Sequence, residues 1–66
     1  MSEETRELLT LARELRARAE EVLARAENFQ GEYAKKVMRD IAASYEKLAA
    51  RLEYEAGVWR LPVARE

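Results

Sequence analysis

Apolar residues recur at alternating spacings of three and four along most of the chain. In the stretch from residue 36 to residue 53, the large members of this pattern are Met38, Ile41, Tyr45, Leu48 and Leu52. This spacing keeps side chains on one stripe of an α-helix. The row beside the stripe holds only small residues, Ala42, Ala49 and Ala56. Because small residues let a neighbouring helix approach closely, this helix is expected to contact more than one neighbour.

A second helix is predicted upstream. Its stripe consists of Thr5, Leu8, Ala12, Leu15, Ala19, Val22, Ala26 and Phe29, again at spacings of three and four. Ser2 is a suitable N-cap, and the acidic residues that follow it favour the positive end of the helix dipole. The pattern therefore predicts a helix from about residue 3 to residue 28.

Polar residues and a glycine interrupt the pattern at residues 28–31. Asn28 or Gly31 is expected to take the left-handed conformation that ends a helix, with the turn at residues 29–31 and the second helix at about 32–56. So short a connection makes the helices antiparallel neighbours, with facing residue numbers that sum to about 60. Ala12 would then face Leu48, and truncating a fully buried Leu48 to alanine should cost about 2 to 5 kcal/mol.

The C-terminal segment 57–66 is predicted to be an ordered apolar tail. Gly57 suits the left-handed position just after a helix, and Pro62 prevents a regular helix from continuing through it. Trp59 and Leu61 are expected to lie across the open end of the hairpin or on a partner. Together these elements make one domain, residues 1–66, of the all-α class, built as an antiparallel two-helix hairpin.

The length of the chain points to self-association. A monomer of 66 residues buries only about 60% of its unfolded surface, so a chain of this size usually needs additional support. Apolar and small residues outside the stripes exceed what one hairpin can cover, and we expect two copies to form a four-helix bundle. The candidate interface residues are Leu9, Leu11, Leu23, Ala42, Ala49, Trp59 and Leu61.

The composition offers little for catalysis. The chain contains no cysteine and no histidine, which removes disulfides, thiolate ligands, the commonest transition-metal ligand and the commonest general base. No glycine-rich phosphate loop is present, and no acidic pair shares a predicted pocket. We therefore predict no catalytic, cofactor-binding or metal-binding residue, and a protein that is not an enzyme.

Twelve basic and thirteen acidic side chains are interspersed along the chain and give a net charge of −1. The arginines of the first helix, Arg13, Arg16, Arg18 and Arg25, are the only support for an alternative reading as a nucleic-acid-linked regulator, because phosphate binding normally needs a basic excess on one element. A second alternative is a small-ligand site at a subunit interface near Tyr45. The chain shows no membrane-spanning run, and a cytoplasmic location is expected.

The segment MRDIAASYEKLAARLE, residues 38–53, resembles a group of short uncharacterised alpha-proteobacterial proteins with a similar I-A-x-x-Y-E-x-L-A sequence near the C-terminus. The resemblance covers the second half of the chain and implies a small bacterial helical protein without a known activity. The function expected from the sequence is a non-enzymatic interaction or structural module that acts through self-association or through binding another protein.

Overall fold

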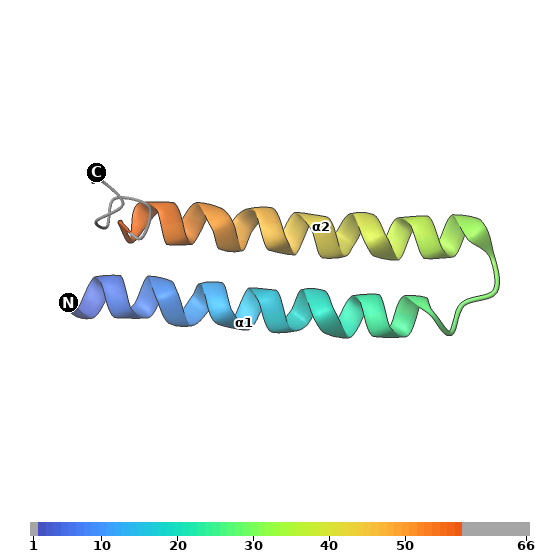
Figure 1. The fold of residues 1–66 in the computed structure, drawn as a ribbon, viewed down its shortest axis with the longest axis horizontal. Helices are drawn as coiled ribbons and strands as arrows, with labels where there is room; N and C mark the ends of the chain where they lie inside the picture. The colour runs from blue at the N-terminus through green and yellow to red at the C-terminus, as the bar shows by residue number, and fades with distance from the viewer. Residues whose placement is uncertain (1, 58–66) are drawn as a thin grey trace, which may run out of the picture.

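The computed structural model describes residues 2–57, which form two α-helices, α1 (Glu3–Ala26) and α2 (Glu32–Glu55). The helices lie side by side and run in opposite directions, so α1 begins and α2 ends at the same end, termed the open end (Figure 1). The connection at residues 27–31 forms the other end, the turn end. The predicted all-α antiparallel hairpin is confirmed, and it is a single layer of two helices.

The ends of α1 follow from local hydrogen bonding. At its start the Oγ atom of Ser2 accepts from the backbone N–H of Thr5 at 3.0 Å, as predicted for an N-cap. At its end the backbone hydrogen bonds span three residues instead of four, as in a 3₁₀ turn: Asn28 N–H donates to the carbonyl of Arg25, and Phe29 N–H donates to that of Ala26. The helix therefore ends at Ala26, two residues before the predicted residue 28.

The two glycines differ in conformation. Gly31 is the N-cap of α2, with an extended backbone at φ −86°, and no non-glycine residue in the range 2–57 has a positive φ. The prediction that Asn28 or Gly31 adopts the left-handed conformation is therefore wrong. Gly57, in contrast, has a φ of 87° and donates its N–H to the carbonyl of Tyr54, as expected just after a helix. The helix α2 ends at Glu55, one residue before the predicted end.

The helices meet along two rows of alanine, termed the alanine seam. Its members are the fully buried residues of the described chain, Ala12, Ala19 and Ala26 in α1 and Ala42 and Ala49 in α2. Within each helix these alanines are seven residues apart, which places them on one line along the helix. Methyl groups on both sides allow the helix axes to approach to the short end of the usual 8–10 Å range, roughly 8 Å.

The predicted burial of the apolar stripe of α2 is wrong for two of its large residues, Ile41 and Leu48, whereas Met38, Tyr45 and Leu52 are half-buried. Leu48 is 50% exposed and Ile41 is 40% exposed, so neither fills the space opposite an alanine of α1. The close approach of the alanine rows carries the contact between the helices and leaves the larger side chains beside the seam. The expected loss of about 2 to 5 kcal/mol for Leu48→Ala applies to a fully buried leucine and does not apply within this hairpin.

Ala42 and Ala49, which were candidates for a subunit interface, contribute instead to the contact within one chain. Both are buried within the hairpin, Ala42 at 2% exposure and Ala49 at 0%. Among the described residues, α1 is the element that packs against them. Their small size serves the contact between α1 and α2 of the same chain.

Candidate protein-interaction surface

The seam divides the hairpin into two faces with different chemistry. Side chains three positions after a seam alanine lie on one side of the seam, and those four positions after it lie on the other. Because the helices are antiparallel, the same rule places equivalent rows of both helices on the same face. The first face, termed the apolar face, contains Leu8, Leu11, Leu15 and Val22 of α1 and Met38, Ile41, Tyr45, Leu48 and Leu52 of α2. Towards the turn end the row of Leu11 continues with two basic residues, Arg18 and Arg25.

An interhelical groove of about 390 Å³ on the apolar face confirms that the rows of the two helices meet there. Leu11 and Leu15 of α1 line it together with Leu48 and Leu52 of α2, and Glu14 and Arg18 lie at its α1 side. Leu15 and Leu52 are half-buried, whereas Leu11 is 48% exposed. Among the described residues, no large side chain is fully buried. The face is thus a largely apolar surface, bordered on α1 by charged residues, that the hairpin leaves partly in water.

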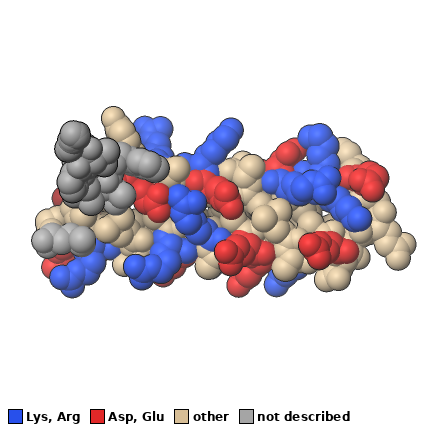
Figure 2. Space-filling model, in the orientation of Figure 1, with Lys and Arg blue, Asp and Glu red and all other residues tan. Residues whose placement is uncertain are grey.

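The opposite side, termed the charged face, carries rows of mixed sign. Its members are Arg6, Leu9, Arg13, Arg16, Glu20 and Leu23 of α1, Glu27 just after α1, and Lys36, Arg39, Ala43, Glu46, Ala50 and Glu53 of α2. Figure 2 shows a face on which basic and acidic side chains cover both helices. Towards the open end the α1 rows are basic and the α2 rows acidic, and towards the turn end the signs are reversed. The pattern therefore places opposite charges across the seam at both ends.

One contact across the charged face is a two-pronged ion pair between Arg16 and Glu53. Arg16 Nη2 donates to Glu53 Oε1 at 2.8 Å, and Arg16 Nε donates to Oε2 at 3.2 Å. The hydrogen bond from Arg16, followed by the Coulomb attraction, lowers the pKa of Glu53 against an opposing effect of partial desolvation. The same hydrogen bond raises the pKa of Arg16. Side-chain exposures of 43% and 23% mean that solvent screens the pair.

Replacing Glu53 by glutamine is expected to lower stability at neutral pH and to have less effect in acid. A carboxyl group whose pKa is lowered by folding contributes stability above its unfolded pKa, and this contribution is lost as the pH falls through the folded pKa. Urea unfolding of the parent protein and of Glu53→Gln at pH 7 and at about pH 3, on either side of the ordinary glutamate pKa of about 4.3, measures the difference. In an Arg16→Gln background the same change should have no such pH dependence, and a dependence that persists there would assign it to another contact.

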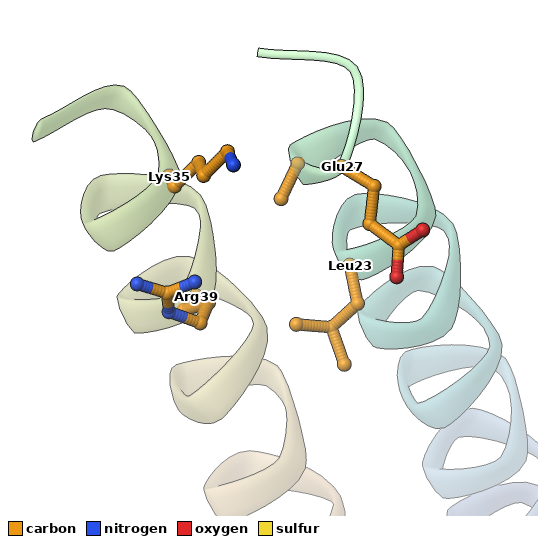
Figure 3. Close-up of a pocket in the computed structure, with 5 residues that line it drawn as sticks. Leu23, Glu27, Lys35 and Arg39 are labelled. Atoms are coloured by element: carbon orange, nitrogen blue, oxygen red, sulfur yellow. The ribbon is translucent and has the colours of Figure 1, made fainter. Parts of the chain in front are cut away.

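A second groove on the charged face lies near the turn end. It has a volume of about 340 Å³ and is lined by Leu23 and Ala26 of α1, by Glu27 just after α1, and by Lys35 and Arg39 of α2. Figure 3 shows that the two basic side chains come from one helix and Leu23 and Glu27 from the other. A groove with both signs of charge, open to solvent and without a buried polar group, offers no defined ligand chemistry.

The predicted interface residues do not share one surface. Leu11 belongs to the apolar face, whereas Leu9 and Leu23 lie on the charged face, where Leu9 is half-buried and Leu23 is 38% exposed. Trp59 and Leu61 lie outside the described residues. Sequence reasoning also missed members of the apolar face, Ile41 and Leu48 above all, because it assigned them to the contact between the two helices of one chain. The sequence feature that could have placed Ile41 and Leu48 outside this contact is the row of alanines beside them, because small residues let a neighbouring helix approach closely on that side.

The described residues do not gather side chains for other chemistry. Within the range 2–57 no group of three acidic residues is placed to hold a metal ion. The hydroxyl of Ser44 donates to the carbonyl of Asp40 one turn earlier, a local contact within α2. The four arginines proposed for nucleic-acid binding fall in three different rows around α1, with Arg16 on the charged face and Arg18 beside the apolar groove. Neither described helix is both long and apolar enough to cross a membrane.

Comparison of the chain with protein families, with curated proteins and with solved structures finds no match.

Proposed function

We propose that this chain is a non-enzymatic assembly module in which the apolar face packs against the apolar face of a second copy to form a four-helix bundle. The observation that carries the proposal is the burial pattern: only alanines are fully buried in the described hairpin, while every large residue of the apolar face retains exposed surface. Stable helical domains cover such a face with a second layer. A second copy supplies that layer.

The size of the face supports a second copy as the occupant. A helix of 24 residues is about 36 Å long, and two helices side by side are about 20 Å wide, so the face measures roughly 700 Å². Stable interfaces bury about 600 to 1,000 Å² on each partner. The face is therefore large enough for a stable dimer, and both helices present the spacing of three and four that lets like faces interdigitate.

Sedimentation equilibrium from low micromolar to millimolar concentration tests the proposal. We expect a species of twice the chain mass of 7.7 kDa over most of this range. Circular dichroism on the same samples should show helix content falling together with the dimer on dilution, because burial of the apolar face stabilises both helices. A monomer at all concentrations that retains its full helix content would overturn the proposal. The apolar face would then be a candidate binding surface for a different protein.

A further inference from the structure

The groove on the apolar face lies close to the point where the chain leaves α2. Two of its lining residues, Leu48 and Leu52, precede Gly57 by nine and five positions, which corresponds to roughly 14 and 8 Å along the helix axis. The chain continues with residues 58–66, VWRLPVARE, which lie outside the described range. An extended chain advances about 3.3 Å per residue, so about four residues beyond Gly57 are enough to reach the level of Leu48.

The end of α2 directs the chain towards this groove. Gly57 donates its backbone N–H to the carbonyl of Tyr54 at 3.0 Å and has a φ of 87°. A left-handed glycine with this hydrogen bond is the described part of a Schellman motif. In this motif the residue after the glycine commonly makes an apolar contact with the third or fourth residue from the end of the helix. The apolar residue at these positions of α2 is Leu52, so Val58 is expected to contact it.

The sequence of residues 58–66 is typical of an extended segment with one apolar side. Trp59, Leu61 and Val63 follow one another at intervals of two positions, and such residues share one side of an extended chain. Pro62 does not fit a helix interior, and it favours an extended conformation at Leu61. The segment therefore offers a row of apolar side chains at the end of α2 where the groove lies.

The groove has exposed apolar surface for this row to cover. Leu11 and Leu48, on opposite sides of it, are each about half exposed. Towards the turn end the row of Leu11 continues with Arg18 and Arg25, so the more apolar half of the face is the half at the open end. A segment joined to the groove by only a few residues has an effective concentration in the millimolar range. This short connection favours the groove of the same chain over the groove of a second copy at micromolar concentration.

We infer that residues 58–66 fold back onto their own chain and cover the groove, with Trp59 packed between Leu11 and Leu48. The contact regulates association, because a second copy packs on the whole apolar face only after this segment has left the groove. The inference rests on the proposed function in this respect alone: competition with a second copy needs the dimer, whereas coverage of the groove does not.

A pair of cysteines tests the coverage at dilutions where the chain is a monomer. The chain has no cysteine, and Glu14 borders the groove on α1. In Glu14→Cys/Leu61→Cys, mild oxidation should give a disulfide within one chain, which mass spectrometry of the unreduced protein identifies. Arg13→Cys/Leu61→Cys carries the first cysteine at nearly the same height on the charged face and should form this bond much more slowly. Equal rates for the two variants, or disulfides between two chains only, would overturn the coverage.

The affinity of the dimer provides the second test. Trp59→Ser/Leu61→Ser disrupts the apolar row in the full chain. Because both copies must release the segment, coverage in about half to two thirds of the separated copies means that the dissociation constant should fall by roughly four- to ninefold in this variant. Ala64→Ser, on the other side of the extended segment, should leave the constant unchanged. An unchanged or weaker dimer of the double variant would overturn the competition. A disulfide within one chain, in a protein that is a monomer at every concentration, would instead keep the coverage and overturn the dimer.

Discussion

Leu48→Asp is expected to convert the dimer into a monomer at concentrations where the parent protein is fully dimeric. Leu48 lies on the apolar face, lines its groove and is half exposed in the hairpin. Covering this position with a second copy would take the aspartate out of water, which costs several kcal/mol per carboxylate. Because each dimer contains two such sites, we expect the dissociation constant to rise more than about a hundredfold, a loss of roughly 3 kcal/mol or more. Sedimentation equilibrium measures the change.

Leu23→Asp is the matched control for this experiment. It makes the same substitution at a leucine of similar partial exposure, 38%, on the charged face. The dimer affinity should stay within about threefold of the parent value, in keeping with a substitution outside the interface. If Leu23→Asp separates the copies and Leu48→Asp does not, the interface lies on the other side of the hairpin.

The second large effect is expected at the alanine seam. Ala19 is completely buried where α1 meets α2, and Ala19→Leu would place a much larger side chain between two closely spaced helices. Overpacking of this kind typically costs about 1 to 3 kcal/mol, and a contact lined by alanine on both sides leaves little room to relax, so we expect a value near 3 kcal/mol. Urea unfolding at a fixed protein concentration measures the loss, since association changes the apparent stability.

Ala17→Leu is the control for the seam. Ala17 is exposed in the same helix, two positions from Ala19, and leucine and alanine have similar helix propensities. Its free energy of unfolding should stay within about 0.5 kcal/mol of the parent value. Equal effects of the two substitutions would show that the alanine row does not form the contact between the helices.

The sequence predicted the elements of this fold well. The spacing of three and four defined two helices, Ser2 marked the start of α1, and Gly57 marked the end of α2. These signals are local: they depend on the period of the apolar residues and on the backbone preferences of single positions. The turn was predicted within a few residues, but its left-handed residue was not, because a turn can satisfy its carbonyl groups through tighter hydrogen bonds instead.

The pattern could not decide which row of α2 faces α1. Tyr45, Leu48 and Leu52 form the stronger apolar stripe, and a hairpin considered by itself should bury its largest residues. Ala42 and Ala49 carry the contact instead, since two rows of methyl groups fit more closely than a row of leucines against alanines. The spacing of apolar residues indicates that one face of a helix is apolar, but it does not indicate which neighbouring helix covers that face. This ambiguity also placed Ala42 and Ala49 among the candidates for a second subunit.

The ion pair between Arg16 and Glu53 could not be predicted from the sequence, for a similar reason. The two residues are 37 positions apart, and their numbers do not match the register expected for directly facing side chains. They meet because both follow a seam alanine by four positions, which is known only once the seam is known. The sequence shows which charged residues share a row along one helix. Which rows of two helices pair with each other can be predicted only when the residues at the helix contact are known.

The alanine seam repeats every seven residues, and this repeat affects how α1 and α2 stay aligned along each other. Alanines seven residues apart on both helices would still meet if α2 slid along α1 by one heptad, so the seam by itself fits more than one alignment almost equally well. The few residues of the turn prevent such a slide, and Arg16 would lose Glu53 if it occurred. A hairpin with a turn lengthened by a heptad would therefore sample shifted alignments while its methyl contacts stayed intact.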